Sequence, residues 1–482
     1  MPPHRSFIIS LLDFDSFFCS VEIARLEKEN PDIRNQPVGV GQRGALIAIN
    51  YVARHLGVPK MCTLEKARSI VPEIQCVDVN LQLYRDVSLE IFKLITTLLG
   101  SDSFIRKVSI DEAYLDLDPL VKHLLVSSTP LQIVDLLKQT LSQSCLKCLD
   151  EPSLSFDVPT LFKAMSSPSP KYCPPPNVYN SLLLLGVHCV NSIRAQIWET
   201  FRLTCSAAVS PFMETSKMFA GFNKPNGSTL VPFTSIPHCY LDKTSAAIFS
   251  VGPKTSQRFD DLGYHLIRDF INGPTKLNTN DVHLNNMYIH VKSLSLGKGT
   301  QLFEPKKEGL GTKQVGVSKV TQPLQVYEEV VGLMEKLCND LIGRVQANFK
   351  NGFDHRRARL LTVSCKRIKL GESSRSVRLS GSKVTVEKLI QKSREVLDEH
   401  FSKEFQVITL GITLSNFVED GNVVSLLQRS SKKKEVKKQD DDDCFVVSDD
   451  DSDDVIVVDD DDDVILESKP LKSSTPKLKK SR

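Results

Sequence analysis

The spacing of apolar residues in the first part of the chain changes repeatedly between that of strands and that of helices. Residues 5–12 form a short apolar run typical of a buried strand, and this run stops at Asp13. A second strand-like run, over 104–110, stops at Asp111. The other predicted elements are helices over 17–28, from Tyr51, over 81–99 and over 190–203, and strands at 38–40, 46–50 and 205–209. These alternations predict a mixed α/β fold.

The remainder of the chain contains two further blocks and two segments of unusual composition. Short helices with turns are predicted over 236–285. Residues 288–418 are predicted to run strand–helix–strand–strand–helix–strand. The helices of that block are expected from Tyr327 to Val345 and over 386–401, and the last strand over 407–414, with Ile408, Leu410, Ile412 and Leu414 on one buried face. The Pro- and Ser-rich residues 151–175 are predicted to be a surface insertion.

Carboxylates follow both of the early strand-like runs. A buried strand tolerates a carboxylate poorly unless the charge is paired or bound to a metal. Asp13, and Asp111 with Glu112, would therefore form an oxygen-rich pocket for divalent cations if the two strands were neighbours. Such a pocket meets the requirement of two-metal phosphoryl transfer. The alternative at this point is that the acids are ordinary residues at strand ends.

Charge is distributed unevenly along the 482 residues. The net charge is +3, but residues 431–482 hold 11 basic and 16 acidic residues, which leaves the first 430 residues at +8. A basic body with an acidic appendage is typical of a nucleic-acid-binding protein with a separate interaction tail. The 12 cysteines are scattered, so we expect reduced thiols, and Cys145-x-x-Cys148 has no second pair to complete a zinc site. We expect no signal peptide and no membrane span.

Three motifs in order resemble those of the Y-family, the translesion DNA polymerases. They are Asp13-x-Asp15-x-Phe17-Phe18, the run 50–58 (NYVARHLGV), and Ser109-Ile110-Asp111-Glu112-Ala113-Tyr114. Residues 206–210 (SAAVS), residues 217–226 (KMFAGFNKPN) and Gln42 are similar to the eta branch of that family. The resemblance covers roughly residues 5–418. It implies a DNA-directed DNA polymerase acting on primer–template DNA and deoxynucleoside triphosphates.

The resemblance also implies the fold of a right-hand polymerase. The palm would comprise residues 1–18 and 81–235, the fingers 19–80, a helical thumb 236–287 and an α/β little finger 288–418. Residues 419–482 are expected to form a disordered acidic tail. In the thumb, Gly252 and Gly263 are expected to lie in the two halves of a helix–hairpin–helix-like unit that binds DNA phosphates, with a plain helical bundle as the alternative.

Roles for the acidic residues follow from the same resemblance. Asp13, Asp111 and Glu112 would hold two Mg²⁺ ions, with Mn²⁺ as a substitute, and the carbonyl oxygen of Phe14 would add a ligand. Asp15 and Asp116 have no metal role in the family and are interpreted as structural.

The resemblance further implies the residues that contact the nucleotide and the DNA. Tyr51, Arg54 and Lys224 would hold the phosphates of the nucleotide. Phe18 would exclude a 2′-OH. Phe17 is more typical of a core residue but is also counted among the nucleotide-binding residues. Gln42 would lie beneath the template base, and Lys60 stands where the eta branch carries an arginine. The expected DNA-binding residues are Arg356, Arg357, Arg359, Lys366, Arg367, Lys369, Arg375 and Arg378.

The tail departs from the eta branch. Beyond residue 418 there is no histidine and one cysteine, Cys444, so a ubiquitin-binding zinc finger cannot form there. No clamp-binding box is recognised, which leaves a sliding-clamp contact open. Val455, Ile456, Val457 and Val458 between aspartates resemble a SUMO-interacting motif, the alternative being a solvated acidic spacer. Lysine clusters at 432–438 and 477–480 are either nuclear import signals or simple counter-charge, and we expect a nuclear protein.

The sequence therefore predicts translesion synthesis, eta-like and directed to ultraviolet photoproducts. Two other classes of protein are alternatives. A nucleotidyl cyclase also places two acids on palm-like strands, but it would not need the triphosphate-binding residues together with a basic C-terminal domain. A catalytically weak scaffold for other translesion polymerases is the second alternative, and the intact set Asp13, Asp111 and Glu112 argues against it.

Overall fold

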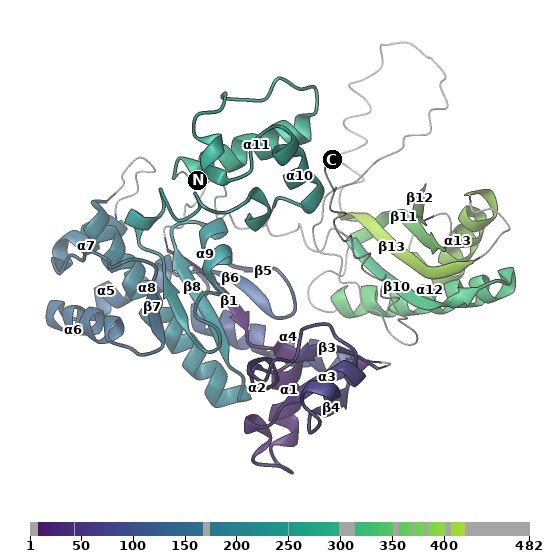
Figure 1. Cartoon of the computed structure of the whole chain (residues 1–482), viewed down its shortest axis with the longest axis horizontal. Helices are drawn as coiled ribbons and strands as arrows, with labels where there is room; N and C mark the ends of the chain where they lie inside the picture. The colour runs from purple at the N-terminus through teal and green to yellow at the C-terminus, as the bar shows by residue number, and fades with distance from the viewer. Residues whose placement is uncertain are drawn as a thin grey trace, which may run out of the picture. The chain divides into compact units, whose positions relative to one another are not determined.

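The computed structural model describes residues 8–42, 44–166, 174–248, 250–297, 314–349, 356–368, 371–379, 384–400 and 406–419. The chain divides into two compact units, residues 1–309 and 310–482 (Figure 1). The predicted tail motif, Lys369 and Cys444 lie outside the described residues. No helix among those described combines the length and apolarity needed to span a bilayer.

A six-stranded sheet of order β5-β6-β1-β8-β9-β7 is the centre of the first unit. Its strand β1 is apolar on both faces, because residues of alternate parity enter two different cores. Ile8, Leu12 and Phe14 pack on one side, and Ile9 and Leu11 pack on the other. The strands are β1 (Ile9–Phe14), β5 (Ile105–Lys107), β6 (Glu112–Asp116), β7 (Leu146–Cys148), β8 (Cys205–Ser210) and β9 (Ser228–Leu230).

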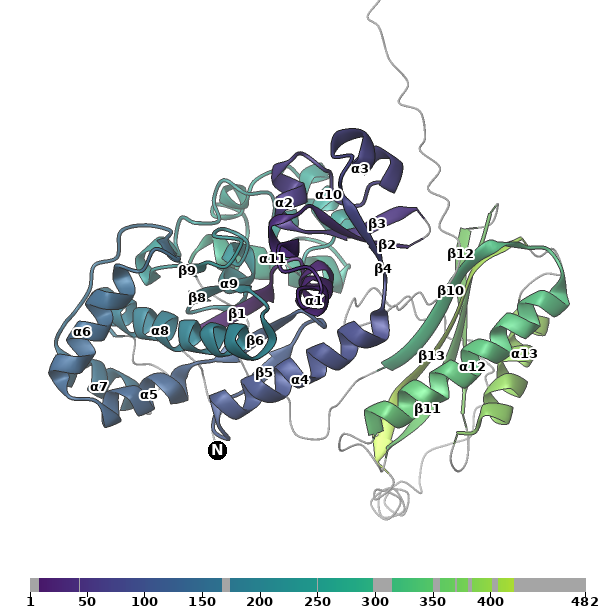
Figure 2. The same ribbon diagram turned by 90° about the horizontal axis from the view of Figure 1, so that it is seen from below.

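Long helices cover the first of these faces (Figures 1 and 2). The central one, α8, approaches the sheet so closely that a Cβ at Gly186 would lie 2.4 Å from the Ile8 side chain. Within the predicted surface insertion over 151–175, residues 158–166 form a helix whose Leu161 is fully buried. The helices on this face are α4 (Leu81–Leu99), α5 (Asp118–Ser127), α6 (Pro130–Leu141), α7 (Val158–Ser166) and α8 (Pro176–Phe201).

A second set of helices covers the opposite face. Leu284, Tyr288 and Val291 of α11 pack with Phe259 and Phe270 in one core. The predicted domain boundary at 287/288 was wrong, because it falls inside α11 and that helix belongs to the first unit. The elements here are α9 (Met213–Phe219), η2 (Phe233–Ser235), η3 (Ser245–Ala247), α10 (Pro253–Asp261), η4 (Ile267–Phe270) and α11 (Val282–Ser295).

A small three-stranded sheet of order β3-β2-β4 completes the first unit. Asn50 joins its parts, because its side chain accepts from the N–H of Val38 at 3.1 Å and from that of Ala53, at the start of α2, at 3.0 Å. The elements are α1 (Phe17–Leu26), η1 (Ile33–Asn35), β2 (Val38–Gln42), β3 (Ala45–Ile49), α2 (Tyr51–His55), α3 (Leu64–Ile70) and β4 (Gln75–Asp78).

The second unit has the predicted order of elements. Its sheet runs β10-β13-β11-β12, and both helices pack on one face (Figure 2). The buried face of β13 includes Leu410, Ile412 and Leu414 as predicted, but Val407 replaces Ile408, because a register shift between Lys366 and Arg367 reverses the alternation. The elements are β10 (Gln314–Leu324), α12 (Tyr327–Phe349), β11 (Arg356–Arg367), β12 (Gly371–Arg378), α13 (Val386–His400) and β13 (Val407–Glu419).

Candidate active site

The predicted acids meet at one edge of the six-stranded sheet. Strands β1 and β6 are antiparallel, and Asp13 lies directly opposite Glu112. The prediction that 104–110 is one strand ending at Asp111 was wrong: β5 stops at Lys107, and Asp111 lies in the turn before β6. The Phe14 N–H donates to the carbonyl oxygen of Asp111 at 2.9 Å, which ties this turn to β1.

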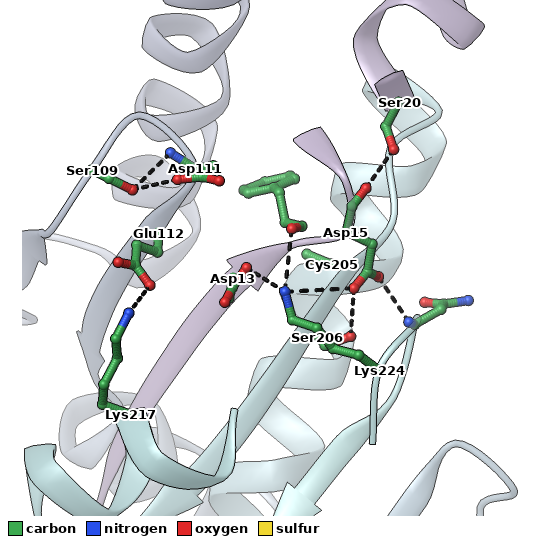
Figure 3. Close-up of polar contacts among 12 residues, drawn as sticks. Asp13, Asp15, Ser20, Ser109, Asp111, Glu112, Cys205, Ser206, Lys217 and Lys224 are labelled. Carbon is green, nitrogen blue, oxygen red and sulfur yellow. Dashed lines mark hydrogen bonds and ion pairs between the residues drawn. The ribbon is translucent and has the colours of Figure 1, made fainter. Parts of the chain in front are cut away.

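Each of the three carboxylates contacts a different polar group (Figure 3). The Lys224 ammonium contacts Asp13 Oδ1 and lies 3.4 Å from the Phe14 carbonyl oxygen. The Lys217 ammonium contacts Glu112 Oε2. The Ser109 hydroxyl donates to Asp111 Oδ1. The site therefore combines three acids with two lysines.

Burial sets the electrostatics of Glu112. Loss of solvent raises the pKa of its carboxyl above the ordinary value, and the negative charges of Asp13 and Asp111 add to that rise. The Lys217 ammonium acts in the opposite direction by stabilising the carboxylate. The three acids are thus close enough to repel one another, which makes a cationic partner favourable at this edge of the sheet.

The donor chemistry fits a hard divalent cation, because carboxylate and carbonyl oxygens are the ligands of Mg²⁺ and Mn²⁺. No cluster of three or more His, Cys, Asp or Glu side chains arranged around a common point is found among the described residues. Each acid instead contacts a group outside the set of acids. Asp13 contacts Lys224, Glu112 contacts Lys217, and Asp111 contacts Ser109. The same residues would have to turn toward one another to hold ions.

Asp15 does not join the three acids, although it belongs to the same motif. Its side chain is 2% exposed. Its Oδ1 accepts from the Ser206 hydroxyl at 2.9 Å, and its Oδ2 accepts from the Asn226 N–H at 2.7 Å. Asp116 is fully buried and accepts from the Asp118 N–H at 3.1 Å. Both carboxylates are used for contacts inside the protein.

Tyr51 and Arg54 share one face of α2, as their spacing predicts. The Arg54 guanidinium carbon lies 4.4 Å from the centre of the Tyr51 ring, and Arg54 Nε donates to the Ile49 carbonyl oxygen at 3.1 Å. Burial raises the pKa of Tyr51, and the charges of Lys224, Asp15 and Asp13 also act on it. The tyrosine therefore lies within electrostatic reach of the lysine and the acids.

The two phenylalanines after Asp15 have different surroundings. Phe18 is partly buried and stacks on Tyr84, with ring centres 4.5 Å apart and planes 19° apart. The Tyr84 hydroxyl donates to Glu22 Oε1 at 2.9 Å, so a buried carboxylate fixes the supporting ring. Phe17 is 3% exposed in the core. The burial agrees with the core character expected of Phe17, and a nucleotide contact of this residue stays a prediction.

Gln42 and Lys60 belong to the small sheet and the loop beside it. Gln42 ends β2, opposite Ala45, and is partly exposed. Lys60 is exposed in the loop between α2 and α3. That loop is joined to β3, because the Leu46 N–H donates to the Cys62 carbonyl oxygen at 2.8 Å.

The basic residues of the second unit do not share one face of its sheet. Arg378 lies opposite Leu360 and Lys366 opposite Glu372, on the face away from the helices. Arg375 lies opposite the buried Val363, on the helix side of β12. Successive residues of a strand point to opposite faces, so these cations lie on both sides of the sheet, and their binding to DNA stays a prediction. Gly252 and Gly263 also differ from expectation, since they flank a single helix, α10, after the short η3.

Four residues around the site were not singled out from the sequence. Lys217 lies in the quoted run 217–226, so a basic residue near the acids could have been considered. Tyr84, Glu22 and Arg194 carry no local signal, because only the packing of distant segments brings them to the site.

The fold and the site define an α/β protein with a carboxylate–lysine centre at a sheet edge, and comparison with known proteins identifies its family. Residues 12–221 match the impB/mucB/samB family, and residues 312–427 match the C-terminal domain of that family. The chain therefore belongs to the impB/mucB/samB family. The Y-family membership predicted from the motifs is confirmed.

Individual relatives are distant. DNA polymerase eta of Arabidopsis thaliana is 26% identical over 279 residues, which are 55% of this chain and 39% of that protein. Human DNA polymerase kappa is 23% identical over 447 residues, 84% of this chain and 47% of that protein. DNA polymerase IV of Vibrio vulnificus is 22% identical over 340 residues, 70% of this chain and 76% of that protein. The chain thus spans less than half the length of the eta and kappa relatives.

Proposed function

We propose that this protein is a DNA-directed DNA polymerase that performs translesion synthesis by two-metal nucleotidyl transfer. The observation that carries the proposal is the pairing of Asp13 with Glu112 on neighbouring strands, with Asp111 tied to the same strand by the Phe14 N–H. The names of the relatives, all DNA polymerases, support the reaction class. In this interpretation, the six-stranded sheet and its helices are the palm, the small sheet is the fingers, residues 236–297 are the thumb and the second unit is the little finger.

Asp13, Asp111, Glu112 and the Phe14 carbonyl oxygen would hold two Mg²⁺ ions, for which Mn²⁺ could substitute. Bound there, the ions would supply activation of the primer 3′-OH and neutralisation of the pyrophosphate leaving group. Before substrate arrives, Lys217 and Lys224 offset the negative charge of the site by pairing with Glu112 and Asp13.

Lys224 has a second task in this proposal. Its ammonium would move from Asp13 to the phosphates of the incoming deoxynucleoside triphosphate, where Tyr51 and Arg54 complete the contact by charge-assisted hydrogen bonds. The stacked position of Arg54 over Tyr51 supports a shared ligand for the two side chains. Phe18, held by Tyr84, would lie against the sugar and leave no room for a 2′-OH.

Primer–template DNA would lie along the helix-free face of the second unit. That face combines Lys366 and Arg378 with small hydroxyl residues such as Thr362 and Ser376, whose oxygens are 2.8 Å apart. Small polar side chains allow a close approach of the phosphate backbone and donate hydrogen bonds without reading bases. The N-terminus of α10 at Gly252 would add a further phosphate contact from the thumb.

The lesion preference is proposed to be eta-like, with ultraviolet photoproducts as substrates and the nucleus as the place of action. The test is extension of a primer past a cyclobutane thymine dimer by the purified chain with Mg²⁺, compared with an undamaged template. Extension on both templates supports the proposal. Extension on the undamaged template alone would reject the lesion preference, and no extension on either would favour the scaffold alternative.

Removing the cations on the helix-free face of the second unit should weaken DNA binding without affecting the rate of nucleotide transfer. For Lys366→Gln with Arg378→Gln, we expect the slope of log affinity against log salt to fall by about 2, since each phosphate contact contributes about 0.9. Arg394→Gln on α13 is the matched control, because that arginine pairs with Glu335 on the helix side. An equal loss in both variants would contradict the assignment of the face.

The tail is proposed to bind SUMO through residues 455–458. A peptide of residues 440–468 should bind in the micromolar range, more weakly as salt rises, because aspartates flank the β-branched run. Alanine at Val455, Ile456, Val457 and Val458 should remove the binding and leave primer extension unchanged. Absence of NMR shifts along the edge strand of SUMO would identify the tail as a solvated spacer.

A further inference from the structure

A buried arginine supports the turn that carries Lys224. Arg194 lies in α8 and is only 8% exposed. Among the described residues its guanidinium has no ion-pair partner, so neutral acceptors must compensate its desolvation. It donates to the Cys205 carbonyl oxygen at 2.7 Å, to Asn191 Oδ1 and Ser228 Oγ at 2.8 Å, and to Asn226 Oδ1 at 2.7 Å.

Asn226 connects this arginine to the acidic centre. Its side-chain oxygen accepts from Arg194, while its N–H donates to Asp15 Oδ2 at 2.7 Å. The other oxygen of Asp15 lies 3.9 Å from the Lys224 ammonium (Figure 3). Asn226 is thus held between a buried guanidinium and a buried carboxylate, two residues after Lys224. A lysine at 194 could not reach the same acceptors, because it lacks the planar fork of donors.

The other end of the turn is also anchored. Asn223 Nδ2 donates to the Cys145 carbonyl oxygen at 2.8 Å and to that of Ser228 at 3.0 Å. The turn is so tight that a Cβ at Gly227 would lie 2.0 Å from the Asn223 carbonyl oxygen. Lys224 therefore extends from a backbone that is fixed on both sides.

We propose that Arg194 is a positioning residue for Lys224, acting through Asn226. This inference rests on the proposed function in one respect, namely that Lys224 contacts the triphosphate. Loss of the Arg194–Asn226 contact would let the turn move and would weaken the nucleotide interaction, while the acids and the fold remain. The effect should therefore appear in KM for the nucleotide more than in kcat.

The test uses two substitutions in the full chain, each with a matched partner. Arg194→Lys should raise KM for the nucleotide roughly ten- to a hundredfold, because a hydrogen bond to a charged group contributes about 1.5–3 kcal/mol. Arg34→Lys is its control, since Arg34 also makes several contacts, with Glu27 and the Arg202 carbonyl oxygen, but none with the turn. An equal KM change in both variants would overturn the proposal.

The second pair of substitutions is made at Asn226 and does not disturb the core. This residue has a positive φ of 52°, which glycine tolerates, so Asn226→Gly removes the acceptor without backbone strain. Asn226→Asp keeps an oxygen for Arg194 and should restore KM to near the wild-type value. Failure of the aspartate to restore KM would count against the proposal, as would a lowered melting temperature in Asn226→Gly with unchanged KM.

A third comparison, made in the Lys224→Ala variant, separates a positioning role of Arg194 from a general structural role. In Lys224→Ala, adding Arg194→Lys should change KM by less than about twofold, because the lysine that it positions is absent. A full further loss would show that Arg194 acts elsewhere. If the wild-type chain does not extend primers, the proposed function fails. The positioning role is then still decided by hydrogen exchange of residues 223–228, which should speed up in Arg194→Lys and not in Arg34→Lys.

Discussion

Replacing Asp111 and Glu112 together with alanine should reduce nucleotide incorporation by at least about 10³-fold, because loss of even one preorganised electrostatic group at a transition state costs about 10²–10³. The two residues lie in and just after the turn that the Phe14 N–H ties to β1, and Glu112 lies directly opposite Asp13. Without them Asp13 alone cannot hold two cations. DNA binding should persist, since the proposed DNA-binding face is in the second unit. The measurements are single-turnover incorporation and fluorescence anisotropy with labelled primer–template.

The control for this experiment is Asp102→Ala. Asp102 is an exposed acid in the loop before β5, so its removal changes the net charge without touching the three carboxylates. We expect wild-type incorporation from it. Retained incorporation in the double variant, with an unchanged melting temperature, would reject the assignment of Asp111 and Glu112. Loss of both incorporation and DNA binding would indicate a folding defect, which the milder pair Asp111→Asn and Glu112→Gln would separate from loss of charge.

Replacing Phe18 with alanine should admit ribonucleotides. Overlap of a hydroxyl with a packed ring costs about 1–3 kcal/mol, so discrimination between a deoxynucleotide and its ribonucleotide should fall by between about fivefold and a hundredfold. The ring cannot move aside easily, because it stacks on Tyr84, which is fixed by Glu22. The measurement is the ratio of kcat/KM for the two nucleotides.

Tyr84→Phe provides a graded version of the same experiment. It keeps the stacked ring but removes the hydroxyl that donates to Glu22, so a smaller loss of discrimination is expected than for Phe18→Ala. Tyr179→Phe is a matched control, because Tyr179 is a buried tyrosine of α8 that packs against Phe233 instead. Unchanged discrimination in Phe18→Ala would place the sugar contact at another residue.

Local pattern was sufficient wherever an element depends on its own residues. The helical spacing over 81–99 predicted α4 with the bounds that the structure has, because its apolar stripe and its Asn80 cap are both local. The order of elements in the second unit was predicted for the same reason. The motifs around Asp13 and Asp111 were enough to indicate the family, since they lie in contiguous runs of the chain.

Tertiary structure decided which of these residues meet. The antiparallel pairing of β1 and β6 places Asp13 opposite Glu112, and no spacing within either strand determines that register. Arg375 and Arg378 lie three apart in one strand and so point to opposite faces by alternation alone, but only the packing of the two helices decides which of those faces is covered. Lys217, Tyr84 and Arg194 come to the site from helices distant in sequence, where packing alone makes them neighbours of Glu112, Phe18 and Asn226.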